Sequence, residues 1–236
     1  MCSLEKRGNI FILTLTGSGE HRLNPTLLDE IQWAISQVRS QSSTSSVLIT
    51  TAHGKFFSNG YDLPWAHQSS SQFLSRMILM DSKLRSVVAD LISLPVPTIA
   101  AVSGHASAAG FIFALSHDYV LMKRDRGFLY MSELDLKLKL SIPAWFMALI
   151  RCKIGPPMSR RDVVLRADKV TADEAVKKGI IDSVYDSAEE TLEAAVDLAE
   201  KLVARKWNGD VYAQIRMDLL SDVLDEIRLS FTGSRL

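Results

Sequence analysis

The sequence predicts an α/β protein with mainly parallel strands. Segments rich in β-branched and aromatic residues alternate with segments whose apolar residues recur at helical spacing. Strands separated by helices usually pair in parallel, because the helix carries the chain back to the same end of the sheet. The chain has 236 residues, 47% hydrophobic and 23% charged, which suits one globular core with at most a small addition.

The first strand, helix and strand are predicted at residues 9–52. Residues 9–16 form a β-branched and aromatic run that ends at a Gly-Ser-Gly turn. Asn24 can cap a following helix, Pro25 suits its first position, and apolar residues recur at helical spacing up to residue 38. A serine-rich connector, residues 40–46, leads directly to a strand at residues 47–52.

The pattern repeats in the middle of the chain. A glycine-punctuated loop at residues 54–62 precedes a long amphipathic helix at residues 72–94, which Pro95 and Pro97 stop. Then we expect, in order, a buried strand, a tight turn of small residues, a short apolar helix and another strand, at residues 98–103, 104–108, 109–116 and 119–123.

The remainder is predicted to be mostly helical. After an extended piece at 128–130, helical spacing appears at 143–152, 157–165, 171–178, 188–206 and 210–229, with a short strand at 180–185. We therefore divide the chain into a core, residues 1–185, and a helical region, residues 186–236, for packing or self-association.

Composition excludes several classes of protein. The 27 basic residues balance 27 acidic ones, so a bulk nucleic-acid binder is not expected. The two cysteines, Cys2 and Cys152, cannot form a disulfide scaffold, and the five histidines fall in no metal-binding spacing. Residues 1–8 carry charges but no apolar run, so a secretory leader is not expected. The most apolar stretch, residues 91–115, is broken by prolines and polar residues, so a membrane span is not expected either.

Common catalytic motifs are also missing. Gly17 and Gly19 supply only part of a dinucleotide-binding glycine motif, and no phosphate-binding loop with its lysine occurs. Ser107 stands one place late for the nucleophile turn of a serine hydrolase.

Two loops of small residues, 56–63 and 103–110, carry the chemistry that the sequence does suggest. Each follows a segment of β character, and small residues let a substrate oxygen approach bare backbone amides. An amide in the first turn of a helix adds the positive end of the helix dipole, so together the loops could form an oxyanion site. For either loop taken alone, an ordinary tight turn is the favoured interpretation, because turns of small residues are common in α/β proteins.

In their order, these motifs resemble the crotonase family, the enoyl-CoA hydratase/isomerase group. The resemblance covers roughly residues 10–185 and rests on Arg22-Leu23-Asn24-Pro25, Phe57 to Leu63, Ala101 to Leu115 and Asp118-Tyr119. It implies a spiral of repeated ββα units with a helical C-terminal region, and assembly as homotrimers or dimers of trimers. It also implies an acyl-CoA thioester as the substrate, so that coenzyme A arrives with the substrate and no separate cofactor is needed.

The resemblance also assigns residues to the site. The backbone amides of Tyr61 and Ala109 would bind the thioester oxygen. The residues expected to contact the substrate are Lys55, Ser58, Asn59, Gly60, Tyr61, Asp62, Leu63 and Ile112.

The acids distinguish the reactions of this family. Hydratases carry two glutamates, and Ile112 occupies the place of the first, while Glu133 matches the second. The segment around Glu133 resembles isomerases that use one glutamate to convert a 3-enoyl-CoA to the 2-trans-enoyl-CoA in fatty-acid β-oxidation. Two alternatives are a 2-enoyl-CoA hydratase, or another acyl-CoA enzyme of the family, and a non-catalytic acyl-CoA binder.

Two simpler interpretations compete with a catalytic role for Glu133. An isolated glutamate is usually an exposed surface residue, and Asp135 could take the same role, since in an extended segment both would point the same way. If Ile112, Leu134 and Phe146 pack near Glu133, they would raise its pKa.

The final tripeptide, Ser234-Arg235-Leu236, resembles the Ser-Lys-Leu address that the peroxisomal import receptor reads. An arbitrary polar end is the alternative. We expect a peroxisomal protein.

Overall fold

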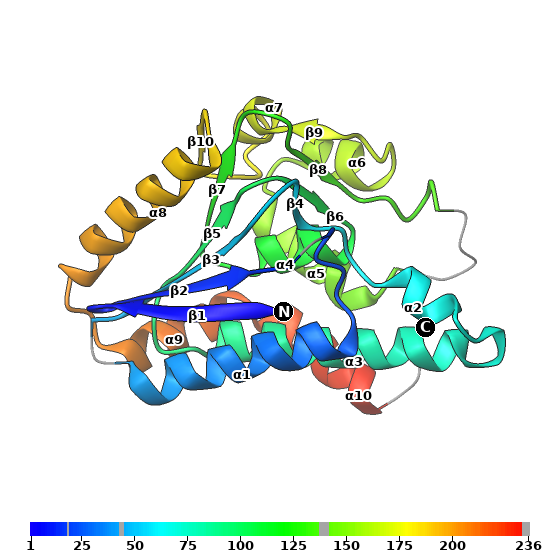
Figure 1. Ribbon diagram of the computed structural model, residues 1–236, viewed down its shortest axis with the longest axis horizontal. Coiled ribbons are helices and arrows are strands. Elements are labelled where there is room, and N and C mark those ends of the chain that lie inside the picture. Colours follow the sequence, from blue (N-terminus) through cyan, green and yellow to red (C-terminus); the bar gives the residue numbers. More distant parts are fainter. Residues whose placement is uncertain (18, 43–44, 137–141, 233–236) are drawn as a thin grey trace.

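Figure 1 shows the computed structural model of the chain, which describes residues 1–17, 19–42, 45–136 and 142–232. The tripeptide 234–236 lies outside the described residues. Helices and parallel strands alternate, which confirms the predicted α/β class.

A six-stranded sheet forms the centre of the fold. Its order is β1-β2-β3-β5-β7-β10, and every neighbouring pair is parallel except β1 and β2. The strands are β1 (Cys2–Arg7), β2 (Ile10–Leu15), β3 (Val47–Ala52), β5 (Thr98–Val102), β7 (Tyr119–Lys123) and β10 (Ser183–Tyr185). The sequence did not predict β1, because this mostly exposed edge strand carries charged residues and lacks a buried apolar run.

A smaller sheet stands beside it, in the order β4-β6-β8-β9. The strands are β4 (Phe56–Ser58), β6 (His105–Ser107), β8 (Phe128–Tyr130) and β9 (Val170–Thr171), and the first three run parallel. Treating residues 54–62 wholly as a loop and residues 104–108 wholly as a turn was therefore wrong. Strands of three residues are too short to show a period in the sequence.

The helices follow the predicted segments with two differences: the short helix α2 was not predicted, and one predicted helix is divided in two. They are α1 (Pro25–Gln41), α2 (Leu63–His67), α3 (Phe73–Ile92), α4 (Ala109–Leu115), α5 (Ala144–Lys153), α6 (Pro157–Val164), α7 (Ala172–Lys177), α8 (Ala188–Val203), α9 (Gly209–Leu219) and α10 (Ser221–Thr232), with a 3-10 turn at Ser70–Gln72. The single helix expected at 210–229 is two, α9 and α10, because the chain leaves helical geometry at Leu220.

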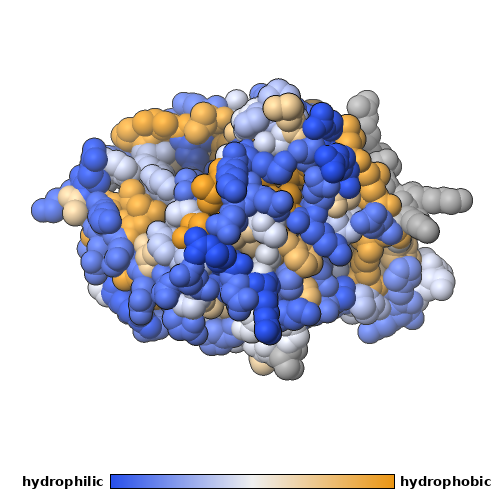
Figure 2. Space-filling view, turned by 90° about the horizontal axis from the view of Figure 1, so that it is seen from above, coloured by the Kyte–Doolittle hydropathy of each residue, from blue (hydrophilic) through white to orange (hydrophobic). Residues whose placement is uncertain are grey.

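The face seen in Figure 2 is mostly hydrophilic, with hydrophobic patches toward its two ends. Among the described helices, none combines the length and the apolar composition that crossing a bilayer requires.

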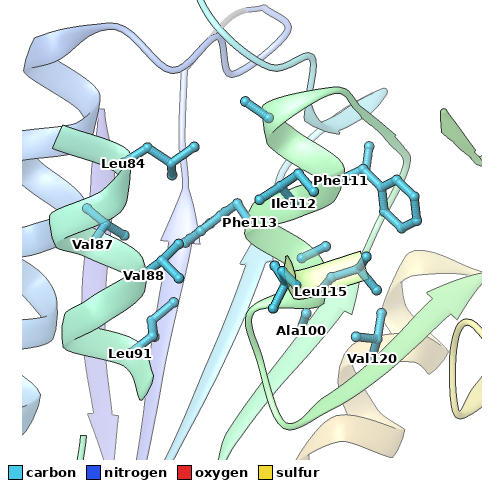
Figure 3. Packing of buried hydrophobic residues seen from close by; sticks show 14 of the residues in the cluster. Leu84, Val87, Val88, Leu91, Ala100, Phe111, Ile112, Phe113, Leu115 and Val120 are labelled. Atoms are coloured by element: carbon cyan, nitrogen blue, oxygen red, sulfur yellow. The ribbon is translucent and has the colours of Figure 1, made fainter. Parts of the chain in front are cut away.

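The large sheet is covered on both faces. Ala195 and Ala199 of α8 pack against Ile49 and Ile99 on one face, while α1, α3 and α4 lie on the other (Figure 1). Figure 3 shows the apolar row of α3 pointing toward Phe113 of α4, with all of these side chains buried. Burial of this helical row explains why α3 forms where the periodicity predicted it.

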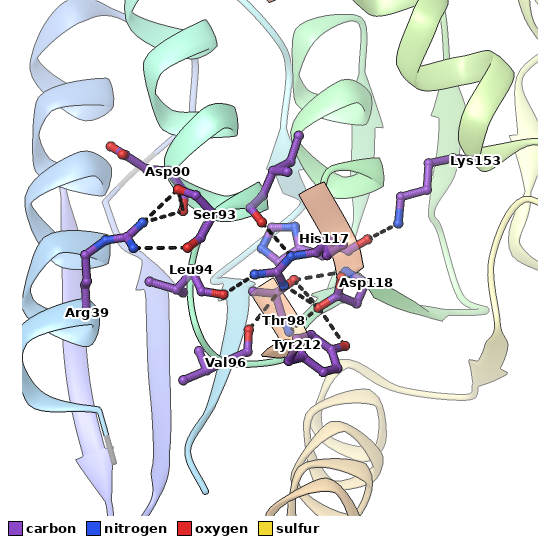
Figure 4. A network of polar contacts seen from close by, with 12 residues as sticks. Arg39, Asp90, Ser93, Leu94, Val96, Thr98, His117, Asp118, Lys153 and Tyr212 are labelled. Carbon is purple, nitrogen blue, oxygen red and sulfur yellow. Dashed lines mark hydrogen bonds and ion pairs between the residues drawn. The ribbon is translucent and has the colours of Figure 1, made fainter. Parts of the chain in front are cut away.

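Arg216 of α9 ties the helical C-terminal region to the core. Its guanidinium donates to the carbonyl oxygens of Ile92 (2.8 Å), Val96 (3.2 Å) and Leu94, and it pairs with Asp118 at 2.7 Å. Figure 4 labels its partners Leu94, Val96 and Asp118, which lie close together. Helix α10 packs on α5 and α3. The C-terminal helices are thus part of the folded body.

Candidate active site

Three parallel strands of the small sheet position the residues of the candidate site. Because β4, β6 and β8 run in the same direction, the segments that follow them meet at one edge of the sheet. These segments carry Tyr61, Ala109 and Glu133, so the structure brings the three predicted functional residues to one edge.

A cavity of about 210 Å³ lies there. Its lining is mainly apolar with a few ionisable groups: Arg22, Asn59, Tyr61, Leu63, Leu74, Met77, Asp81, Ala108, Ser132, Glu133, Leu136, Ile142, Pro143 and Phe146. Leu74 and Leu136 are also 51% and 42% exposed, so the cavity reaches the surface near them. This shape suits an apolar chain with a polar reactive end.

Glu133 faces this cavity from a turn at residues 133–136. Its Oε2 atom is buried and forms no hydrogen bond with any described residue. Burial raises the pKa of the carboxyl to about 7, against a small lowering by its own backbone amide. A carboxyl that ionises near neutrality can both take and return a proton.

Asp135 does not share that position. It is exposed, and its carboxylate accepts a hydrogen bond from the Tyr130 hydroxyl. The chain turns after Ser132, whose carbonyl accepts from the amides of Asp135 (3.0 Å) and Leu136. The two acids therefore do not extend side by side, and Glu133 is the one that lines the cavity.

Of the three apolar residues expected near Glu133, one lines the same cavity and two do not. Phe146 lines the same cavity, whereas Leu134 is 55% exposed. Ile112 is fully buried in the core around α4 and is not among the described residues that line the cavity (Figure 3).

The amides of Tyr61 and Ala109 are both available as donors. Neither donates a hydrogen bond to an acceptor in the described part of the chain. Ala109 is the first residue of α4, so its amide is one of those that a helix leaves unpaired. The preceding Ala108 lines the cavity with a positive φ of 49°, an uncommon conformation for a residue with a side chain.

The two amide-bearing loops are in direct contact. Gly60 has a φ of +74°, and a Cβ placed on it would lie 2.9 Å from the Ser107 carbonyl oxygen and 3.3 Å from the Ala109 nitrogen. A side chain larger than hydrogen would force the loops apart. Glycine is thus required both for the turn and for the approach.

The other predicted substrate residues divide into two groups. Asn59 and Leu63 line the cavity, and the Asn59 amide group donates to Glu20 at 2.8 Å. Asp62 caps α2 by accepting from the Trp65 amide at 3.0 Å. Its role in the structure is therefore to start that helix.

Ser58 and Lys55 lie outside the cavity lining. The Ser58 hydroxyl is buried and donates to the His21 carbonyl at 2.7 Å, whereas Lys55 is exposed with its Nζ 5.5 Å from the Phe56 ring.

Sequence reasoning missed Asp81. This α3 residue is 2% exposed, lines the cavity and pairs with Arg85. Its Oδ1 atom accepts from the Tyr61 hydroxyl at 2.9 Å and from Trp145 Nε1 at 3.1 Å. A signal was present, because Asp81 and Arg85 interrupt the apolar face on which Met77 and the rest of α3 are buried.

No metal centre is formed in the described ranges: no group of three His, Cys, Asp or Glu side chains there is placed to hold an ion.

Comparison with known proteins identifies the family of the chain. The family model for enoyl-CoA hydratase/isomerase matches residues 5–223. The chain is 66% identical over 225 residues to enoyl-CoA delta isomerase 1 of Arabidopsis thaliana, named peroxisomal, covering 95% of this chain and 91% of that protein. It is 53% identical to the plant's isomerase 2, also named peroxisomal, with coverage of 94% and 93%. It is 50% identical to isomerase 3, with coverage of 98% and 96%.

Among solved structures, a probable enoyl-CoA hydratase of Mycobacterium tuberculosis superposes with a TM-score of 0.87 at 20% identity. The match covers 98% of this chain and 93% of that one. At that identity the likeness concerns the fold, and it agrees with the predicted crotonase-like architecture.

Proposed function

The chain belongs to the enoyl-CoA hydratase/isomerase family, and we propose that it is an enoyl-CoA delta isomerase that converts a 3-enoyl-CoA to the 2-trans-enoyl-CoA in fatty-acid β-oxidation. The observation that carries this proposal is the single unpaired acid of the cavity, since Glu133 Oε2 has no hydrogen-bond partner among the described residues. Its relatives of 50 to 66% identity are named enoyl-CoA delta isomerases.

The proposed reaction is a proton transfer within one substrate. The Glu133 carboxylate removes a proton from C2 of the 3-enoyl thioester, and the electron pair moves onto the thioester oxygen as an enolate. The same carboxyl then returns the proton to C4 as the double bond forms between C2 and C3. Atoms and charge balance without any redox step, so the reaction requires no cofactor beyond the CoA of the substrate.

The enolate oxygen is stabilised by the amides of Tyr61 and Ala109 in this mechanism. Both amides are free to donate, and their loops touch. Losing one such donor costs other enzymes about 2.7 to 4 kcal/mol of transition-state stabilisation, so two donors would account for much of the enolate's stability.

Hydration is the second candidate reaction, and the cavity argues against it. Adding water requires a second polar group to hold the nucleophile, but Ile112 is buried in the core. Asp81, the other acid that lines the cavity, is already paired with Arg85 and accepts two further hydrogen bonds.

One pair of assays separates the candidates. The purified protein receives a 3-enoyl-CoA and, separately, a 2-trans-enoyl-CoA, while the absorbance of the conjugated thioester is followed. A rise with the first and no change with the second supports the isomerase. A fall in absorbance with the 2-trans-enoyl-CoA indicates hydration. No change in absorbance with either substrate indicates a non-catalytic acyl-CoA binder.

We further propose a homotrimer or a dimer of trimers assembled through the C-terminal helices. Val211, Ile215 and Leu219 recur every four residues along α9 and are 56%, 63% and 76% exposed, which is unusual for large apolar side chains. Light scattering coupled to gel filtration measures the assembly directly, and a monomer would contradict the proposal.

The proposed location is the peroxisome, reached through recognition of Ser234, Arg235 and Leu236 by the import receptor. Two of the relatives are named peroxisomal, while isomerase 3 carries no such label. A fluorescent protein fused to the N-terminus should enter peroxisomes and should stay outside them when the last three residues are deleted.

A further inference from the structure

We propose that Asp81 is a positioning residue for the isomerisation: it holds the phenol of Tyr61 and thereby fixes the Tyr61 backbone amide that binds the enolate oxygen. The inference rests on the proposed function, because it assigns that amide its task. Asp81 does not touch the reacting atoms in this proposal and acts through Tyr61.

Asp81 is suited to hold a fixed position because it is buried and multiply bonded. Its Oδ1 atom accepts from the Tyr61 hydroxyl at 2.9 Å and from Trp145 Nε1 at 3.1 Å, and Arg85 pairs with Oδ2 one helical turn further along α3. A buried carboxylate is tolerated only when such partners compensate for its lost hydration. These bonds therefore define one geometry for Tyr61, Asp81 and Trp145.

The backbone bonds around Tyr61 hold its carbonyl oxygen, which accepts from the Leu63 amide at 2.9 Å, and the neighbouring peptide groups, but they do not hold its own amide. The Leu23 amide donates to the Gly60 carbonyl at 2.8 Å, and the Asp62 amide donates to the Leu23 carbonyl at 3.4 Å. The Tyr61 amide between them has no acceptor within the described chain, and it follows Gly60, whose φ is positive. The hydrogen bond of the phenol limits how far this peptide unit can rotate.

The ion pair with Arg85 allows the Asp81 carboxylate to lie beside a site where negative charge develops. Asp81 lines the same cavity as Glu133, where a bare carboxylate would oppose the negative charge of an enolate. The ion pair with Arg85, 7% exposed, neutralises Asp81 while leaving its Oδ1 as an acceptor. The helix thus provides a rigid acceptor with no net charge.

The test compares two variants that each remove one hydrogen bond from the same oxygen atom. Tyr61→Phe keeps the ring but loses the hydroxyl, and Trp145→Phe removes the other donor to Asp81. We expect Tyr61→Phe to lower kcat about tenfold with KM changed less than about twofold, because the amide remains but is less well placed. Trp145→Phe should keep kcat within about twofold of the wild type, although its Tm should fall further than that of Tyr61→Phe.

A conservative variant separates positioning from stability. Asp81→Asn keeps a side-chain oxygen for Tyr61 but removes the charge that pairs with Arg85, so it should lower Tm and still retain more of kcat than Tyr61→Phe. The bound state offers a spectroscopic readout. A conjugated 2-enoyl thioester absorbs at longer wavelength when its carbonyl is strongly hydrogen bonded, and this shift should shrink in Tyr61→Phe only.

The outcomes distinguish this inference from the proposed function. If Tyr61→Phe turns over like the wild type while Glu133→Gln is inactive, the positioning role is refuted and the isomerase stands. If kcat follows Tm across all three variants, the network is merely structural and the inference is again overturned. If the wild type fails to isomerise any 3-enoyl-CoA, the proposed function itself fails.

Discussion

Gly110 lies directly against Ser58: a Cβ on Gly110 would stand 2.3 Å from the Ser58 carbonyl oxygen. Helix α4 and the last residue of β4 are therefore in contact at a place where no side chain fits. Gly60, which follows β4, also lies close to the turn before α4, at the Ser107 carbonyl oxygen. The spacing of the two proposed oxyanion donors is thus set by two glycines, one on each loop.

Replacing Gly110 by alanine should separate these loops. The added methyl group must displace backbone rather than a flexible side chain, so we expect a loss of about 1 to 3 kcal/mol in the free energy of unfolding. Because the donors move apart, kcat should fall at least about tenfold. Gly155→Ala is the matched control, since a Cβ there meets no atom within 4 Å. A Gly110→Ala enzyme with wild-type kcat would show that the loop spacing is unimportant.

Substituting Glu133 by glutamine should abolish turnover while preserving binding. The amide has the same shape but cannot accept the C2 proton, and general acid–base groups typically contribute about 10²- to 10⁴-fold to rate. Acyl-CoA affinity, measured by calorimetry, should change little. Asp135→Asn is the control, because Asp135 is exposed and does not line the cavity. If Asp135→Asn rather than Glu133→Gln loses activity, our assignment of the acid is wrong.

The reaction should depend on pH through the same residue. Glu133 must be ionised to act as the base, and burial raises its pKa to about 7. We therefore expect kcat/KM to increase as the pH rises through about 7 and to level off above that value. The initial rate of absorbance increase with a 3-enoyl-CoA, recorded between pH 5 and pH 9, gives the profile. A midpoint near the ordinary glutamate pKa of 4.5 would contradict the buried environment.

The free energy of unfolding should fall as the pH rises toward 7, whereas kcat/KM should increase. The folded-state pKa of Glu133 lies above its unfolded value of 4.5, so the folded protein binds the proton more tightly and loses stability as the pH rises from 4.5 toward 7. Glu133→Gln avoids this ionisation and should be more stable than the wild type at pH 8, by at most about 3 kcal/mol. At pH 4 the difference should vanish. Equal unfolding free energies at pH 8 would show that Glu133 is well solvated in the folded state.

How far the fold could be predicted depended on segment length. The long helices α1 and α3 bury complete apolar rows, so their periodicity was visible in the sequence. The strands β4 and β6 have three residues each, and β1 is a charged edge strand, so none has a distinctive pattern. These elements form because neighbouring strands complete their hydrogen bonds, which is a tertiary effect.

The site was predictable to the extent that its residues lie in local motifs. Glu133 and the loops of Tyr61 and Ala109 could be proposed because the short motifs around them, in their order along the chain, resemble those of the crotonase family. Asp81 was missed because its partners Tyr61 and Trp145 are 20 and 64 residues away and a charged residue in a helix is ordinarily solvated, although its place on the apolar face of α3 marked it as unusual.

Arg216 should be the most costly single arginine to remove from the C-terminal helices. It is 5% exposed, donates to three backbone carbonyls and pairs with Asp118 across 98 residues of sequence. Arg216→Met removes the cation that pairs with Asp118 and the donor to those carbonyls, so we expect the free energy of unfolding in urea to fall by about 3 to 5 kcal/mol. Arg228→Met, which breaks an exposed pair with Asp225, should cost about 0 to 1 kcal/mol. Similar losses in both variants would mean that α9 is held by its apolar contacts, and that the buried guanidinium contributes little beyond offsetting its own desolvation.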